Sequence, residues 1–359
     1  MTKNSQIQAE DAAAATPPAT DRAPRRWPMW AALAIGLGVA LAPVAFQLFD
    51  RAPKGKDMID GFRPYMTEKK ISKFQHDMKE IDVAVTEART KLRPALRSQL
   101  QLDDAGIDTK FALYADFEKR WRGIDNDMSD MLRTMHRDLG DFAAVDALPP
   151  FNLFPWFFVA PGVLIVGAAS AGLLATRRRR RGSGPRSTVA PATMLIVMGL
   201  GLIAAPVAFQ MFTRAPKGGH MINDFRPLMT TPKVQRIQGY FLVIGAGEGT
   251  LRNEMLPAVG ATGTASATGT ANTTTAADAS QFPAIARFSA DWQTISNEMA
   301  PMIGAMSDNV ANYQAVDALP SFPLFPWFFV APGVLVLAFG IVARRAARTQ
   351  SSQQQGDMT

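Results

Sequence analysis

APVAFQLFDRAPKGKDMIDGFRPYM spans residues 42–66, and APVAFQMFTRAPKGGHMINDFRPLM spans residues 205–229, with 18 of 25 aligned positions identical. A second block recurs as AVDALPPFNLFPWFFVAPGVL at 144–164 and AVDALPSFPLFPWFFVAPGVL at 315–335, with 19 of 21 positions identical. The chain therefore contains one unit twice, and we name the two units the first copy and the second copy. A repeat of this length sets the architecture, because both copies must be built on one plan.

Four stretches without a charged residue adjoin the repeated blocks. They are Met29–Phe49, Trp156–Ala175, Thr193–Phe212 and Trp327–Ala343. Each has about the length needed to cross roughly 30 Å of hydrocarbon as a helix, and only a helix satisfies the backbone of such a segment in lipid. The first stretch has the position of a signal peptide, but the same APVAFQ exit occurs in mid-chain at 205–210. We therefore interpret it as a retained membrane helix.

The distribution of charge predicts how these helices are oriented. The short segments 1–28, 176–192 and 344–359 are basic, and 176–192 carries six arginines and no acid, whereas the long segments 50–155 and 213–326 are close to neutral. Short basic segments stay in the cytoplasm, while long domains cross largely regardless of charge. We expect both termini and the arginine loop inside the plasma (inner) membrane, and both long segments outside. The arginine run then indicates orientation and anionic lipid, and we expect no nucleic-acid partner.

Both long segments carry two apolar stripes with helical spacing. In the first copy, Thr67 is a candidate helix cap and Pro94 should kink or end the first helix. The stripes are Ile71, Phe74, Met78, Ile81, Val85, Ala88 and Leu92, then Phe117, Trp121, Ile124, Met128, Met131, Met135, Phe142 and Val145. In the second copy, Thr231-Pro232 predicts the helix start. The matching stripes are Val234, Ile237, Phe241, Ile244, Leu251 and Met255, then Phe288, Trp292, Ile295, Met299, Met302, Met306, Tyr313 and Val316.

Each long segment is therefore predicted to be an antiparallel helical hairpin standing on its two membrane helices. A single hairpin buries its stripes poorly, whereas two hairpins can close a four-helix bundle. The predicted fold is an all-α membrane protein with four transmembrane helices in two tandem repeats and a bundled stalk. Trp121 and Trp292 should lie buried in equivalent layers. The tips differ, because the second copy carries a Gly/Ala/Thr/Ser loop at 260–280 that we expect to be flexible.

No residue pattern indicates an enzyme, a cofactor or a metal site. The chain has no cysteine, which excludes thiol chemistry and disulfides. His76, His136 and His220 fall at positions that do not correspond between the copies, and no metal-ligand spacing links them. The glycines of Gly245–Gly249 lie in a helical stripe with no preceding strand, so they predict a weak point in a helix rather than a phosphate loop. The methionine triplets have the spacing of a packed core.

A set of cations and aromatics recurs where the predicted membrane helices meet the outer segments, and we call it the collar. Its members are Arg51, Lys54, Arg63, Asp146 and Trp156, with Arg214, Lys217, Arg226, Asp317 and Trp327 in the second copy. Interfacial aromatics anchor most membrane proteins. Repeated cations could instead hold lipid head groups or a partner, or pair with Asp146 and Asp317, since exposed charges add little to stability.

A layer of prolines and glutamines lies about six residues inside the same predicted boundary. Its members are Pro43, Gln47, Pro161, Pro206, Gln210 and Pro332. Each proline frees a backbone carbonyl and tends to kink its helix, and the glutamines could bond the freed carbonyls. Glycines along the membrane helices would allow close packing elsewhere. This combination predicts a shallow, outward-facing vestibule.

Two functions remain open from the sequence. The first is a non-enzymatic envelope scaffold, accessory or signal-coupling subunit, which contacts membrane lipids and passes any signal to a protein partner or a second copy of the chain, because its inner segments are short. The second is a transporter or lipid-handling subunit that uses the vestibule. The membrane helices lack the ionisable residues that mark ion-coupled pathways, but a lipid cargo would not need them.

Overall fold

The computed structural model describes residues 27–180, 189–260 and 281–356, and all regular structure in these ranges is helical. Most of the 1–28 tail, half of the arginine loop and nearly all of the 260–280 tip loop lie outside the described residues. The chain divides into two compact units. We call residues 1–40, 160–202 and 331–359 the apolar unit, and residues 41–159 and 203–330 the polar unit.

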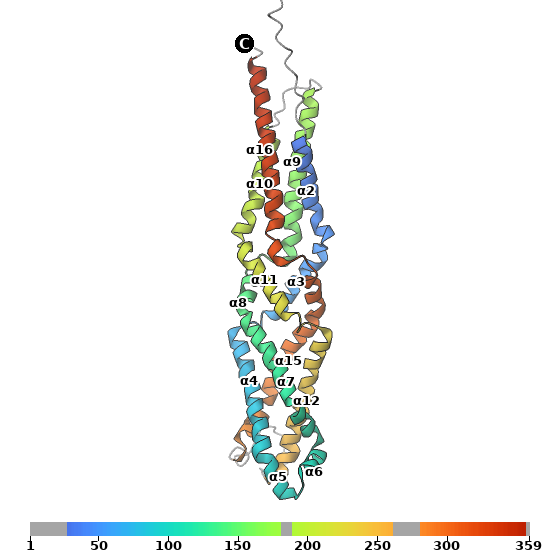
Figure 1. Ribbon diagram of the computed structural model, residues 1–359, viewed down its shortest axis with the longest axis vertical. Coiled ribbons are helices and arrows are strands. Elements are labelled where there is room, and N and C mark those ends of the chain that lie inside the picture. Colours follow the sequence, from blue (N-terminus) through green and yellow to red (C-terminus); the bar gives the residue numbers. More distant parts are fainter. Residues whose placement is uncertain (1–26, 181–188, 261–280, 357–359) are drawn as a thin grey trace, which may run out of the picture. The chain divides into compact units, whose positions relative to one another are not determined.

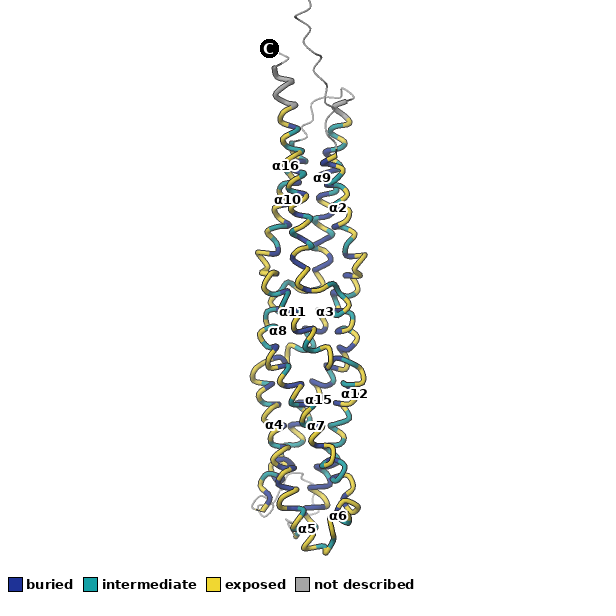
Figure 2. The backbone as a smooth tube through the Cα atoms, in the orientation of Figure 1, coloured by how far each residue is buried: buried dark blue, intermediate teal, exposed yellow. Residues whose placement is uncertain are grey.

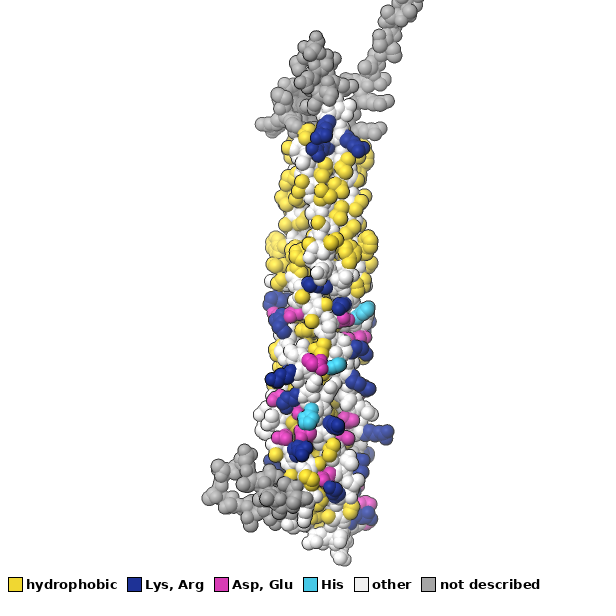
Figure 3. Space-filling view, turned by 90° about the vertical axis from the view of Figure 1, so that its left-hand side faces the viewer, with side chains coloured by type: hydrophobic (Ala, Val, Ile, Leu, Met, Phe, Trp, Pro, Cys, Tyr) yellow, Lys and Arg dark blue, Asp and Glu magenta, His cyan; other side chains and the backbone are white. Residues whose placement is uncertain are grey.

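Four helices are long and apolar enough to cross a membrane. Their candidate spans are Trp27–Ala45, Phe151–Arg177, Val189–Ala208 and Phe322–Thr349. They belong to α2 (Trp27–Ala45), α9 (Phe154–Arg180), α10 (Val189–Ala208) and α16 (Trp327–Gly356). Apolar side chains cover the face of the apolar unit seen in Figure 3, as expected for helices that face lipid.

Glycines bring the helices of the apolar unit together in pairs. A Cβ at Gly36 of α2 would lie 2.8 Å from Ile165 of α9, and a Cβ at Gly199 of α10 would lie 2.7 Å from the amide nitrogen of Leu337 of α16. These separations are shorter than real Cβ contacts allow, so only glycine fits at the two positions. The prediction of close helix packing at small residues is confirmed at both.

The first and third spans end earlier than the sequence predicted. α2 ends at Ala45 and α10 at Ala208, whereas the apolar stretches run on to Phe49 and Phe212. Gln47 and Gln210 adopt left-handed backbone angles, with φ of 54° and 53°. A left-handed residue cannot continue a right-handed helix, so the chain turns there into α3 (Leu48–Phe62) and α11 (Met211–Phe225).

The polar unit is built on four long helices. They are α4 (Glu68–Glu87), α7 (Ala112–Arg137), α12 (Thr231–Thr250) and α15 (Pro283–Asp317). Within each copy, α4 contacts α7 and α12 contacts α15. Between copies, α4 contacts α15 and α7 contacts α12 (Figure 1). The short helix α3 packs on α15, and α11 packs on α8 (Leu139–Asp146).

The apolar stripes form the core of this unit, as Figure 2 shows by burial. Both first-copy stripes are buried throughout, and both methionine triplets are buried, which confirms their core role. In the second copy Phe241 and Trp292 are only half-buried. Equal burial of Trp121 and Trp292 was therefore a wrong prediction. The indole of Trp121 donates to Asp82 Oδ1 at 2.9 Å, whereas Trp292 lies against Gly245 and stacks on Phe241.

The helix starts and interruptions recur at corresponding positions. Thr67 caps α4 as predicted, and Thr230 caps α12, one residue before the predicted Thr231. Each helix then passes into a π-helix, η1 (Ala88–Leu92) or η3 (Leu251–Met255), with i→i−5 bonds such as Arg93 N–H to Ala88 O. Pro94 and Pro257 lie two residues after the ends of η1 and η3. A proline has no N–H to donate to the α-helical hydrogen-bond ladder. A widened turn thus replaces the expected break, and the chain continues into α5 (Arg93–Leu100) and α13 (Leu256–Ala258).

Candidate functional site

The collar arginines are held by protein groups in both copies. Arg63 follows the last residue of α3, and its Nη2 lies 2.6 Å from Oδ1 of Asp146, the last residue of α8. Arg226 follows α11 and lies 2.6 Å from Asp317, the last residue of α15. These bonds raise the pKa of Arg63 and of Arg226. Each arginine thus ties the base of its own hairpin together.

Arg51 and Arg214 reach across to the other copy. The Nη1 of Arg51 donates to the carbonyl of Ala318 at 2.7 Å, and that of Arg214 donates to the carbonyl of Ala147 at 2.7 Å. Both carbonyls stand just after a helix, where backbone acceptors lack helical partners. The two contacts correspond residue for residue, so each copy closes the end of a helix in the other.

The remaining collar residues face outward. Trp156 and Trp327 are more than half exposed and meet Phe49 and Phe212 edge to face, at 5.9 and 5.8 Å between ring centroids. Lys54 is exposed and makes no ion pair or hydrogen bond within the described residues. Its counterpart Lys217 is also exposed and lies 3.8 Å from Asp141. The collar therefore separates into arginines that are bonded to protein groups and exposed lysines and tryptophans.

The two glutamines of the predicted proline and glutamine layer bond through their backbone. Gln47 and Gln210 make no side-chain hydrogen bond within the described residues. Their backbone carbonyls accept hydrogen bonds from amides in the first turns of α3 and α11, Arg51 N–H and Arg214 N–H, at 3.0 Å. Pro43 and Pro206 lie in α2 and α10, and Pro161 and Pro332 in α9 and α16. The first pair belongs to the polar unit and the second to the apolar unit, so the vestibule stays a prediction.

Ion pairs also link the two hairpins farther along the polar unit. Lys70 of α4 lies 3.3 Å from Glu298 of α15, and Lys233 of α12 lies 2.8 Å from Asp127 of α7. Tyr240 of α12 also donates to Asp127, at 2.5 Å. Lys233 and Tyr240 together outweigh the burial of Asp127, so its pKa is lowered. The two lysines hold corresponding positions in the copies, as do the two acids.

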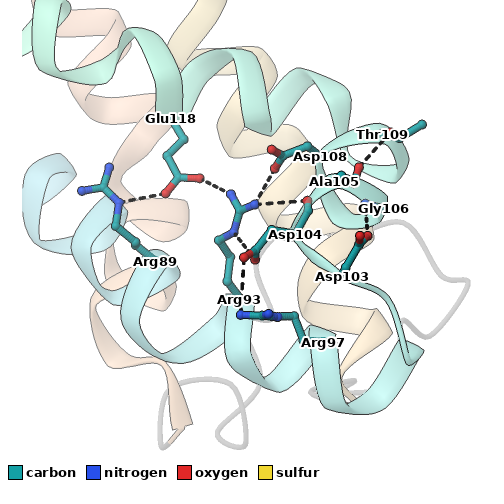
Figure 4. A network of polar contacts seen from close by, with 10 residues as sticks. All are labelled: Arg89, Arg93, Arg97, Asp103, Asp104, Ala105, Gly106, Asp108, Thr109 and Glu118. Carbon is teal, nitrogen blue, oxygen red and sulfur yellow. Dashed lines mark hydrogen bonds and ion pairs between the residues drawn. The ribbon is translucent and has the colours of Figure 1, made fainter.

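The first-copy tip holds a polar network that the sequence analysis missed (Figure 4). The guanidinium of Arg93 in α5 bonds Glu118 of α7 at 2.7 Å and Asp108 of α6 (Asp104–Lys110) at 2.5 Å. Arg89 adds a 2.9 Å bond to Glu118, whose side chain is 10% exposed. Arg93 is itself 15% exposed. The network thus joins three helices around the largely buried pair Arg93 and Glu118, where a hydrogen bond between ions is strong.

A cleft of about 940 Å³ lies beside this network. Its charged lining residues are Arg89, Arg93, Arg97, Asp104, Asp108, Asp116, Glu118, Lys119 and Arg122. Cations and acids nearly balance there, and Arg93 already has its acids in place, so the lining favours a structural clamp over an anion site. No periodic pattern in the sequence predicts this network, because Arg93 and Glu118 meet only after the turn at 101–103 folds back.

Two more features of the tips depend on contacts between copies. Glu87 of α4 accepts hydrogen bonds from the amides of Ala284 and Ile285 at 2.7 and 3.1 Å, and so caps α15. Gly247 of α12 lies so close to Phe117 of α7 that a Cβ there would be 2.3 Å from the ring. The predicted weak point is thus a close helix contact that requires glycine.

Among the described residues, no group of three or more His, Asp or Glu side chains is arranged to hold a metal ion. No protein family matches this chain, and no curated protein or solved structure matches it at a significant level.

Proposed function

We propose that this chain is a non-enzymatic, multi-pass plasma-membrane protein whose polar unit forms a stalk, and that it serves as a scaffold, accessory or signal-coupling subunit for a protein partner. The observation that carries the proposal is the interlocking of the two copies in the polar unit. A Cβ at Gly55 would lie 3.4 Å from Val316, and one at Gly218 would lie 3.3 Å from Val145. The two contacts are equivalent: each joins a glycine of one copy to the corresponding valine of the other copy. The bonds made by Arg51 and Arg214 are equivalent in the same way.

Interlocked copies favour a mechanical role over a catalytic one. Each short helix that follows a span, α3 or α11, rests on a helix of the other copy. A displacement of one hairpin would therefore be transmitted to its counterpart through packed contacts. A stalk with this property can set the position of a partner or convey a change in it.

Cysteine pairs test the interlock directly, because the chain has no cysteine of its own. We expect Gly55→Cys with Val316→Cys, and Gly218→Cys with Val145→Cys, to form disulfides within one chain in membranes. Gly123→Cys with Val316→Cys is the control, since no side chain approaches Gly123. Disulfides that join two chains would indicate a swapped dimer, and no disulfide in either pair would overturn the proposal.

The orientation needs its own test. Reporter fusions after residue 184 and at the C-terminus should read as cytoplasmic, and fusions at residues 105 and 265 as external, because short arginine-rich segments are retained inside. An external C-terminus would reverse the proposed topology and place the polar unit in the cytoplasm.

For the collar, we propose that Lys54 and Lys217 contact anionic lipid head groups while the arginines hold the protein base. The lysines and the collar tryptophans are exposed, whereas the arginines are bonded within the protein. Native mass spectrometry from nanodiscs that contain phosphatidylglycerol should show fewer retained lipids for the Lys54→Gln/Lys217→Gln variant than for the wild type. The matched control is Lys79→Gln/Lys119→Gln. Equal lipid retention in all three proteins would show that Lys54 and Lys217 do not bind lipid head groups.

Lipid handling is a second candidate, favoured by two small apolar chambers between the copies. One, of about 20 Å³, is lined by the first residues of α3 and α11, Leu48 and Met211, and by four phenylalanines. The other, of about 30 Å³, is lined by Met58, Met221 and the corresponding residues around them. Each holds about one water-sized group as it stands, so a lipid chain would need the flexible methionines to move aside.

A phospholipid with a photoactivatable chain tests this candidate in nanodiscs. Labelling of Met58, Met221 or their chamber neighbours would support lipid handling, and Ile59→Trp with Ile222→Trp should then abolish it by filling the chamber. Labels confined to α2, α9, α10 and α16 would exclude it.

A further inference from the structure

Asp138 is a buried acid at the joint between the copies. It stands between α7 and α8, it is 2% exposed, and its Oδ2 has no hydrogen-bond partner among the residues that the structure describes. Asp224 of α11 acts on it from the second copy, and Arg137 contacts both acids, 2.9 Å from Asp224 and 3.6 Å from Asp138. A buried carboxyl with an unbonded oxygen beside a second acid is costly when both acids are ionised.

The second copy contains the same joint without the acids. Asn309 holds the position of Asp138, Asn312 that of Asp141, and Gly61 that of Asp224. Asn309 donates to the carbonyl of Ala305 at 2.9 Å and accepts from Asn312 at 3.0 Å. The joint therefore forms with neutral groups, and the acids of the first joint are not needed to build it.

The charged groups around Asp138 do not cancel its burial. Arg137 comes from α7, Asp141 from α8, and Lys217, His220 and Asp224 from α11, while Lys217 and His220 lie nearer to Asp141, at 3.8 and 4.0 Å. Burial raises the pKa of Asp138 to about 6, with a further contribution from Asp224 that outweighs the opposing effect of Arg137.

We propose that the buried carboxyl of Asp138 binds a proton and makes the contact between α8 and α11 an acid-strengthened joint. With the proton present, Asp138 is neutral and the helices stay together. Without it, a carboxylate that is 2% exposed lies close to a second acid, Asp224, and the repulsion pushes the helices apart. This inference concerns the joint alone, so it does not depend on the proposed stalk function or orientation.

The direction of the pH dependence follows from the raised pKa. Between about pH 4 and pH 6 the folded protein binds more protons at this site than the unfolded chain, so the site's contribution to stability is full at low pH and is lost as pH rises through about 6. A shift from 3.8 to about 6 corresponds to at most about a 160-fold change in the folding equilibrium. The buried Asp77 and Glu248 and the partly buried Asp125 also have raised pKa values. The effect of Asp138 is therefore measured as a difference between variants and wild type.

The first experiment measures thermal unfolding of the full chain in nanodiscs at pH 5 and pH 8. Asp138→Asn introduces the residue of the second copy, and it should raise Tm at pH 8 by several degrees and reduce the fall in Tm between pH 5 and pH 8. Asp141→Asn is the matched control, because it removes a neighbouring acid that is partly exposed and near Lys217. The fall in Tm between pH 5 and pH 8 should be the same in this variant as in the wild type. An unchanged fall in Tm for Asp138→Asn would overturn the proposal.

A distance measurement then locates the effect. Spin labels at Gly140→Cys of α8 and Asn223→Cys of α11, both exposed positions, report on the joint by double electron–electron resonance. The wild-type distribution should be narrow at pH 5 and broader or longer at pH 8, and Asp138→Asn should keep it narrow at both. A wild-type distribution that is the same at both pH values would show that the pair does not move the helices and would also overturn the proposal.

Discussion

In the first copy, the turn between the two long helices folds into α5 and α6 and is tied to α7 by Arg93. In the second copy, the return helix α15 begins at Pro283, and its first amides bond to Glu87 of the first copy. One tip is therefore held by its own ion network, and the other relies on its neighbour. The residues at corresponding positions explain the difference, since Leu256 stands for Arg93 and Ser289 for Glu118.

The bases of the two copies differ far less. The pairs Arg63–Asp146 and Arg226–Asp317 have the same 2.6 Å separation, and Arg51 and Arg214 reach corresponding carbonyls at 2.7 Å. Contacts near the spans thus recur, while contacts at the tips do not. The arginine contacts of the base are therefore common to both copies, whereas the contacts that hold the tips belong to one copy each.

The largest expected effect separates the two tryptophans. Trp121→Ala should lower the free energy of unfolding by roughly 3–5 kcal/mol, because it empties a buried site and leaves Asp82 without its donor. Trp292→Ala should cost only about 1–2 kcal/mol, because a half-buried ring loses less apolar contact. Denaturant unfolding of the full chain in detergent measures both. Equal losses would mean that the two hairpins pack alike and would remove the asymmetry described above.

Breaking the first tip should have the next largest effect. Arg93→Leu, which introduces the second-copy residue, leaves Glu118 almost buried without its main cation and should cost about 2–3 kcal/mol. Adding Glu118→Ser should recover part of that loss, because the unpaired charge is then gone. If the double variant is no more stable than Arg93→Leu alone, Arg93 and Glu118 do not act as a pair.

The stripes, the helical class and the Thr67 cap could be read from the sequence, because each depends on local spacing. The Arg93 network and the Glu87 cap could not, because their partners are brought together only by the turn at 101–103 or by the packing of one copy on the other. The predicted end of the first span was also too late. The apolar residues continue to Phe49, and hydropathy does not detect the left-handed backbone turn at Gln47 that ends the helix. The role of Gly247 was not predicted, because the sequence does not show that Phe117 of the other copy packs against it.

Glycines in α12 provide a matched pair of intermediate size. Gly247→Ala should cost about 1–3 kcal/mol, since its Cβ would lie within 2.3 Å of Phe117 and force α7 and α12 apart. Gly249→Ala meets nothing within 4 Å and should stabilise the helix by about 0.5–1 kcal/mol. Thermal unfolding compares the two variants in one preparation. A gain in stability from both would show that α12 does not approach α7 as closely as described.

The smallest expected effect tests whether the second tip depends on the first copy. α15 starts without a side-chain cap of its own, and Glu87 supplies a carboxylate to the positive end of the helix. Glu87→Ala should therefore cost about 1 kcal/mol, and Glu87→Gln less, because the amide oxygen can still accept one bond. Hydrogen exchange gives the sharper readout: the amides of Ala284 and Ile285 should exchange faster in Glu87→Ala, while those near Met302 should not change. Thr250→Ala is the control, because Thr250 holds the corresponding position and bonds only Ala246 within its own helix. Faster exchange of the same two amides in Thr250→Ala would mean that α15 is sensitive to any change near the tips, and the cap supplied by the first copy would lose its support.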